Sequence, residues 1–157
     1  MRTPEQALAA LGVVLPPPPR PIAVYKPVVI TGGLVFVSGH GPVQADGTLI
    51  RGRLGAELDR EAGYAAARQV GLAMLANLRA ELGSLDRIAR VVKLLGWIAG
   101  PETFTEHPAV LNGCSELFRD VFGADAGVGA RSAIGTNVLP GNIPVEVEGI
   151  FELANRN

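Results

Sequence analysis

Two runs near the end of the chain decide the fold: ARSAIGTNV over residues 130–138 and PVEVEGIFE over residues 144–152. Both contain β-branched residues and alternate between apolar and polar or small side chains, which predicts two strands. The connection over residues 139–143 contains Pro140 and Gly141, which interrupt regular strand pairing. The two runs therefore predict a closing hairpin.

Three further strands are expected upstream. Residues 25–31 and 34–38 are rich in β-branched and aromatic side chains, and the pair Gly32-Gly33 between them is typical of a two-residue hairpin turn. Residues 88–98 are almost continuously apolar, which is typical of a central strand covered on both faces.

Two long helices separate these strands. Apolar and small residues recur at helical spacing over residues 60–82, and Gly83 follows as a stop signal. A second helix is expected from Pro108 to about Phe122. This order of elements predicts an α+β fold, with one mixed, mostly antiparallel sheet and both helices on one face of it.

The beginning of the chain has a different character. The run TPEQ at residues 3–6 has the form of a capping box, which predicts a short helix from about residue 4 to Leu11. Five prolines then fall within residues 16–21, and such a run holds an extended backbone without strand pairing. We expect residues 1–21 to form an N-terminal helix and proline-rich spacer, followed by a single domain over residues 22–157.

The composition limits which kinds of partner the chain is expected to have. Charged residues make up 18% of the sequence, below the typical value of about 25%, and mean hydropathy is +0.28, so apolar surface is expected at subunit contacts. A net charge of -1 without a basic run argues against nucleic acid. No window approaches the roughly 18 apolar residues of a membrane span, and the lone Cys114 fits a reducing compartment. We expect a cytoplasmic oligomer.

A few side chains could carry chemistry. Arg131 lies in a strand poor in charge, and its planar guanidinium suits bidentate capture of a carboxylate, although a structural ion pair is the commoner role. Glu146 and Glu148 are two residues apart on a strand and share one face, which a solvated sheet face would also explain. His40 and His107 lie far apart without acidic or cysteine neighbours in ligand spacing, so no metal site is expected.

Four blocks of the sequence stand out together: Ile22-Ala23-Val24-Tyr25, the run from Leu34 to Gly39, Asn112 with Phe118, and the C-terminal run that includes Ala130 to Ala133, Leu139-Pro140 and Pro144 to Ile150. These blocks resemble the Rid/YjgF family of reactive-intermediate imine and enamine deaminases. Their order and spacing match over roughly residues 20–154. The resemblance implies a chorismate-mutase-like fold and a homotrimer with clefts between neighbouring subunits.

The resemblance also implies roles for individual residues. Arg131 would anchor the carboxylate of the substrate, and Glu148 would position or activate water, so these two are the predicted catalytic residues. Glu146 matches a less functional neighbour. The other substrate-binding positions are Tyr25, Ser38, Gly39 and Asn112. Hydrolysis of an imine by such residues requires no metal and no organic cofactor.

Two positions depart from the family pattern, the N-terminal helix with its proline spacer is an extension beyond it, and two functions therefore stay open. Ala133 stands where the best-known bacterial deaminases carry cysteine, and His40 replaces a usual glutamine. The first function is hydrolysis of small carboxylate-bearing imines or enamines. The second is non-catalytic binding or sensing of a small carboxylate in the same cleft. An RNA-cleaving role ranks last, because the sequence has no basic or aromatic stripe.

Overall fold

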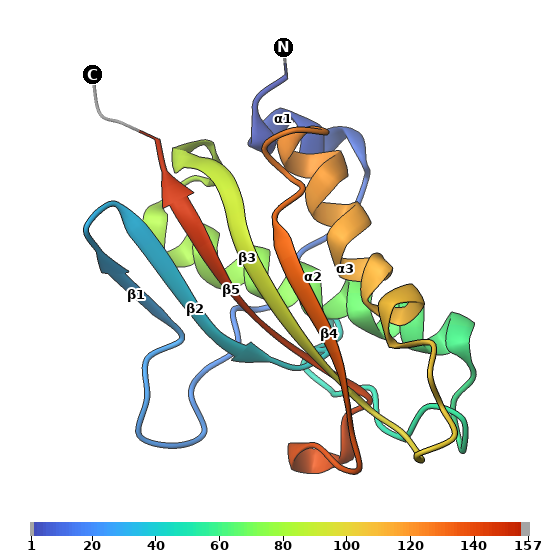
Figure 1. The fold of residues 1–157 in the computed structure, drawn as a ribbon. Coiled ribbons are helices and arrows are strands. Elements are labelled where there is room, and N and C mark those ends of the chain that lie inside the picture. Colours follow the sequence, from blue (N-terminus) through green and yellow to red (C-terminus); the bar gives the residue numbers. More distant parts are fainter. Residues whose placement is uncertain (1, 155–157) are drawn as a thin grey trace.

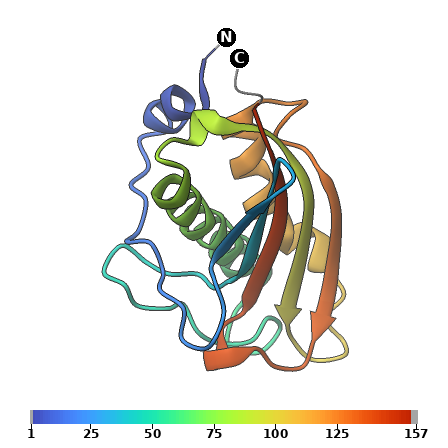
Figure 2. The ribbon, with the colours of Figure 1, turned by 90° about the vertical axis from the view of Figure 1, so that its left-hand side faces the viewer.

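The computed structural model describes residues 2–154, which form one five-stranded sheet with helices packed against one of its faces (Figures 1 and 2). In chain order the elements are α1 (Pro4–Ala10), β1 (Val28–Thr31), β2 (Leu34–His40), α2 (Arg60–Leu82), η1 (Leu85–Arg87), β3 (Ile88–Ala99), α3 (His107–Phe122), β4 (Ala130–Thr136), η2 (Pro140–Asn142) and β5 (Val145–Leu153). The strand order across the sheet is β1-β2-β5-β3-β4.

The strand directions confirm the predicted fold class. The pairs β1–β2, β2–β5 and β5–β3 are antiparallel, and β3–β4 is parallel. The two long helices α2 and α3 lie together on one face of the sheet (Figure 2). Both end where the sequence predicts, at Leu82 and Phe122. None of the helices over residues 2–154 is long and apolar enough to cross a membrane.

The predicted β1–β2 hairpin is confirmed. Thr31 pairs with Leu34, so Gly32 and Gly33 alone make the turn. Both glycines have positive φ, at 55° and 79°, as a turn that follows the twist of two antiparallel strands requires.

The predicted closing hairpin is wrong. β4 pairs in parallel with β3, where Arg131 lies opposite Leu94, and β5 enters the sheet on the other side of β3. The physical reason is the crossover through α3, which carries the chain back so that β4 runs alongside β3 in the same direction. β5 then returns antiparallel and fills the gap between β2 and β3.

The apolar strand β3 is covered on one face within this chain, and not on both as predicted. Its buried residues Val91, Leu94 and Ile98 face the helices, whereas Leu95 and Trp97 on the other face are partly exposed. The neighbouring strands continue this second face, which we call the open face. Its apolar members are Val29, Phe36, Leu95, Trp97, Ile134 and Ile150.

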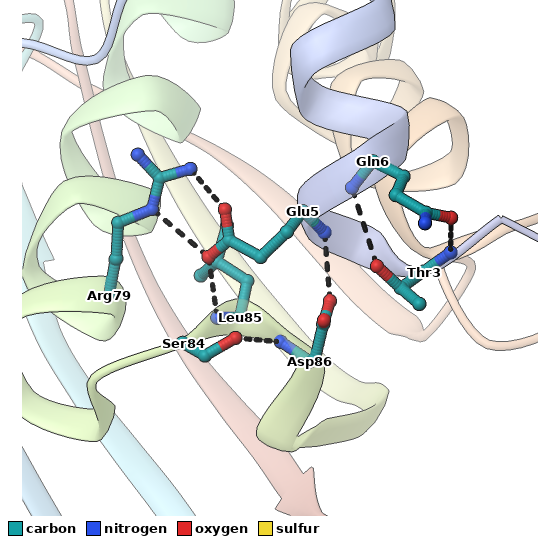
Figure 3. A network of polar contacts seen from close by, with 7 residues as sticks. All are labelled: Thr3, Glu5, Gln6, Arg79, Ser84, Leu85 and Asp86. Carbon is teal, nitrogen blue, oxygen red and sulfur yellow. Dashed lines mark hydrogen bonds and ion pairs between the residues drawn. The ribbon is translucent and has the colours of Figure 1, made fainter.

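The N-terminal helix α1 is fastened to the domain through Glu5 (Figure 3). The Glu5 carboxylate accepts hydrogen bonds from the Arg79 guanidinium and, at 2.9 Å, from the backbone N–H of Leu85. The backbone N–H of Glu5 donates to Asp86 Oδ1 at 2.9 Å. Leu8, only 2% exposed, packs into the main core, and the predicted capping box is present.

Substituting Glu5 by alanine is expected to lower the free energy of unfolding by about 1 to 3 kcal/mol. The change leaves the Arg79 guanidinium and the Leu85 N–H without their acceptor. Urea denaturation measures the effect, with Glu81→Ala as an exposed control that should stay within about 0.5 kcal/mol of wild type. Equal losses in both variants would contradict the anchoring role of Glu5.

Candidate functional site

Two of the predicted site residues, Arg131 and Asn112, come together between β4 and α3. Arg131 Nη1 donates to Asn112 Oδ1 at 2.8 Å and to Ser115 Oγ at 3.1 Å, and Nη2 donates to the carbonyl of Pro108 at 3.4 Å. Ser115 and Pro108 are not among the site residues predicted from the sequence. Their spacing from Asn112, three and four residues along one helix, places all three on the same face of α3 and could have suggested them.

Arg131 has no carboxylate partner among the ion pairs of residues 2–154. Three neutral oxygens orient its guanidinium, and no carboxylate of these residues lies within ion-pair distance of it. A cavity of about 310 Å³ borders this group and is lined also by Asn112, Ser115, Glu116 and Arg119. The structural ion pair considered for Arg131 is therefore not formed here, and the site can receive a small anion.

A second cluster forms on the open face, where β2 carries a bulge. The pairing of β2 with β5 shifts register between Val37 and His40, which leaves Ser38 and Gly39 in the bulge. A Cβ atom on Gly39 would lie only 2.1 Å from Glu146 Oε1. Gly39 is therefore the position that lets the Glu146 carboxylate lie directly against the backbone of β2.

Glu146 and Glu148 share the open face, as their spacing predicts, but their surroundings differ. Glu148 is exposed, whereas Glu146 is half-buried. Burial raises the pKa of the Glu146 carboxyl, and the negative charge of Glu148 raises it further. The carboxyl group with the raised pKa is therefore that of Glu146, which the family resemblance implies to be the less functional neighbour.

The stability of the chain should depend on pH through Glu146. Because folding raises the pKa of Glu146, the stabilisation it brings is complete at acidic pH and is lost as pH rises through its pKa in the folded chain. The isosteric variant Glu146→Gln cannot titrate. The free energy of unfolding of wild type should therefore fall relative to that of Glu146→Gln as pH rises above about 4, the ordinary pKa of a glutamate. Urea denaturation over a series of pH values measures it, and a constant difference between the two proteins would contradict the burial of Glu146.

Tyr25 precedes Lys26, whose carbonyl accepts a hydrogen bond from Ser38 Oγ in the bulge of β2. It is 44% exposed in the loop over residues 20–26, and its backbone N–H donates to the carbonyl of Ala23 at 3.1 Å. Ile22 and Val24 beside it are 89% and 106% exposed. The tip of this loop therefore presents apolar and aromatic side chains outward.

The two clusters point to opposite faces of the sheet. Leu95 pairs with Glu148 on one side and with Ser132 on the other, so Glu148 and Ser132 lie two strand spacings apart, about 9.5 Å. Arg131 is next to Ser132 but turns toward α3. A ligand that touches both Arg131 and the glutamates must therefore pass around β4, which is an edge strand of the sheet.

The two residues that depart from the family pattern are both at least partly buried in this chain. Ala133 packs against the hydrophobic core, and the His40 ring is buried behind the bulge. Cys114 is fully buried, and burial raises the pKa of its thiol to about 12, which removes it as a nucleophile. The described residues contain no group of three His, Cys, Asp or Glu side chains that could hold a metal ion.

Comparison with known proteins identifies the family. The family model described as "YjgF/chorismate mutase-like, putative endoribonuclease" matches residues 5–153, so the chain belongs to this family. Protein TCP17 of Trypanosoma cruzi is 40% identical over 148 residues, which cover 94% of this chain and 92% of that protein.

Solved structures agree with this assignment. A putative endoribonuclease from Shewanella oneidensis MR-1 is 35% identical, with a TM-score of 0.92 over 97% of this chain and 100% of that one. A protein of unknown function from Agrobacterium tumefaciens is 36% identical, with a TM-score of 0.86 over 96% and 92%. RidA from an Antarctic Psychrobacter is 27% identical, with a TM-score of 0.60 over 85% and 92%.

Proposed function

We propose that the chain hydrolyses small carboxylate-bearing imine or enamine metabolites in clefts between the subunits of a homotrimer. The observation that carries this proposal is the Arg131 guanidinium, which neutral oxygens hold beside a small cavity without a carboxylate partner. A half-buried arginine that has no carboxylate partner within its own chain suits bidentate binding of a carboxylate supplied by a ligand.

The glutamates supply the proton chemistry in this proposal. Glu146 in its protonated form, favoured by its raised pKa, gives a proton to the carbon end of an enamine and so forms an iminium ion. The Glu146 carboxylate then accepts a proton from the water that attacks the iminium carbon. Collapse of the resulting carbinolamine releases ammonia and leaves a keto acid. Glu148, expected from the family resemblance to act on water, assists here by raising the pKa of Glu146.

Assembly of several chains would complete the site. The open face is apolar and bears the glutamates, and the edge of β4 separates them from Arg131. A second subunit packed against this face would cover the apolar side chains and enclose a cleft near the β4 edge. The exposed loop with Tyr25 is free to reach a neighbouring chain.

We expect light scattering to give a mass about three times that of the 16.4 kDa chain at micromolar protein concentration. The physical reason is the exposed apolar side chains of the open face, which favour burial between subunits. The variant Trp97→Glu would place a charge on this face and should shift the mass toward that of one chain. A wild-type mass near 16.4 kDa would contradict the shared-cleft proposal.

The activity itself is tested with imines made in the assay. An amino acid oxidase converts an amino acid into its imino acid, and release of the keto acid and ammonia is followed with and without the protein. Catalysis should accelerate this release beyond the spontaneous rate. The endoribonuclease description belongs to the relatives, and the net charge of -1 gives this chain little means of holding phosphates.

A second function, binding of a small carboxylate without catalysis, is favoured by one observation. The Arg131 pocket is built within a single chain, whereas the glutamates lie on the other face of the sheet. Binding of a keto acid through Arg131 without any acceleration of imine hydrolysis would establish this second function in place of the first.

A further inference from the structure

Two polar side chains, His40 and Asn77, are buried in the described part of the chain, at 5% and 7% exposed. His40 lies at the end of β2, and Asn77 faces it from α2. His40 Nδ1 is 2.6 Å from the carbonyl oxygen of Ser38, and His40 Nε2 is 2.7 Å from Asn77 Nδ2. Asn77 Nδ2 also donates to the carbonyl of Pro19 at 3.0 Å. The proline spacer, α2 and the bulge of β2 therefore share one buried network.

The Asn77 amide fixes the state of the His40 ring. Its N–H₂ group donates one hydrogen to Pro19 and the other to His40 Nε2, so Nε2 is an acceptor. Nδ1 then carries the hydrogen and donates to the Ser38 carbonyl. The network thus contains a neutral imidazole, and burial lowers the pKa of His40, which agrees with this state.

The same network holds both ends of the loop over residues 20–26. At the beginning of the loop, Asn77 binds the carbonyl of Pro19. At its end, Ser38 Oγ donates to the carbonyl of Lys26 at 2.7 Å, and Ser38 N–H donates to that of Pro27 at 2.9 Å. The loop between these points projects from the sheet below β1 (Figure 1) and carries the exposed Tyr25.

We propose that Ser38, His40 and Asn77 form a clamp that closes on both ends of the 20–26 loop and so positions Tyr25. His40 and Asn77 are then positioning residues for a small-carboxylate site, and they act through the loop without touching the ligand. The role of Tyr25 rests on the proposed function, whereas the clamp itself rests on the hydrogen bonds alone.

The clamp should open in acid. A proton added at His40 Nε2 would face the N–H₂ group of Asn77, so the amide must turn its oxygen toward the ring and give up its bond to Pro19. Asn77 and Pro19 are uncharged, Val147 is the apolar partner of His40 on β5, and Glu146 lies over Gly39 on the open face. His40 takes part in none of the ion pairs of residues 2–154, so no salt bridge holds the ring in its charged form.

The test uses Asn77→Leu, which keeps the number and branching of the side-chain heavy atoms and removes both hydrogen bonds. The matched control is Gln69→Leu, because Gln69 also lies on α2 and binds the carbonyl of Val43, outside the clamp. Backbone ¹⁵N relaxation at about pH 7.5 gives order parameters for residues 22–26. We expect values near 0.85 in wild type and in Gln69→Leu, and a fall below about 0.6 in Asn77→Leu.

Wild type alone provides a second measurement, which is decisive if Asn77→Leu does not fold. The chain has two histidines, so the imidazole signals of His40 and His107 can be followed separately during an acid titration. Order in residues 22–26 should fall together with protonation of His40. A loop that stays equally ordered throughout the His40 titration, or in folded Asn77→Leu, overturns the clamp.

Pyruvate binding separates failure of the clamp from failure of the proposed function. If the clamp positions Tyr25 for a carboxylate ligand, Asn77→Leu should bind pyruvate about five- to tenfold more weakly than Gln69→Leu does, as expected for one lost hydrogen bond. A loosened loop with unchanged pyruvate binding would support the clamp and would remove Tyr25 from the site.

Discussion

Replacing Arg131 by lysine is expected to weaken binding of a small carboxylate such as pyruvate by about ten- to a hundredfold, the range of a lost charge-assisted hydrogen bond. The lysine ammonium cannot reproduce the planar fork that satisfies Asn112, Ser115 and the Pro108 carbonyl while it presents donors to a ligand. Isothermal titration calorimetry with pyruvate measures the change.

Arg119→Lys is the matched control for this prediction. Arg119 lines the same cavity, but its guanidinium is paired with Asp120 at 3.0 Å. An exposed pair of this kind contributes little, so pyruvate binding should change by less than about threefold. Equal weakening in both variants would show that pyruvate binding does not depend on Arg131 in particular. Unchanged binding in Arg131→Lys would show that a positive charge is sufficient, and would remove the bidentate contact on which both proposed functions rest.

Glu146→Gln is expected to lower kcat for imine hydrolysis by about a hundredfold or more while pyruvate binding changes little. The size follows from the loss of a general acid and base, and the separation from binding follows because Arg131 holds the carboxylate. Circular dichroism confirms that the variant is folded, and steady-state kinetics with an imine generated in the assay gives kcat.

Glu148→Gln is the matched partner, with the same chemical change on the same face. Removing its charge should lower the pKa of Glu146, so that less of the general acid is protonated at neutral pH. The alkaline limb of the kcat/KM profile should then move to lower pH, with a smaller loss of maximal rate than in Glu146→Gln. A larger loss in Glu148→Gln would return the leading role to Glu148, as the family resemblance implies.

Local signals predict the elements that local forces determine. The capping box of α1 and the Gly32-Gly33 turn require only neighbouring residues, and the structure contains both. Strand partners depend on the whole sheet. For this reason the run after Leu139 predicts a hairpin, although β5 crosses to the other side of β3. The apolar sequence of β3 likewise predicts that both faces of the strand are buried, although its outer face is partly exposed within one chain.

The same distinction between local sequence and strand pairing applies to the candidate site. Arg131 and Asn112 belong to two elements that the fold class already places together, and the structure joins them at 2.8 Å. The environment of Glu146 arises from the register between β2 and β5 and from a bulge that brings Gly39 against its carboxylate. Neither follows from the spacing of residues 146 and 148, which predicts only that they share a face.

The position of β5 has a consequence for synthesis on the ribosome. β5 follows every other strand in the sequence, yet it lies in the middle of the sheet, between the β1–β2 pair and the β3–β4 pair. Until residues 145–153 emerge, the nascent chain holds two separate half-sheets whose inner edges, on β2 and β3, have no partner. Unpaired edges of this kind readily accept strands of other chains. The interval before β5 emerges is therefore the stage at which the growing chain exposes the most unpaired strand edge to other chains.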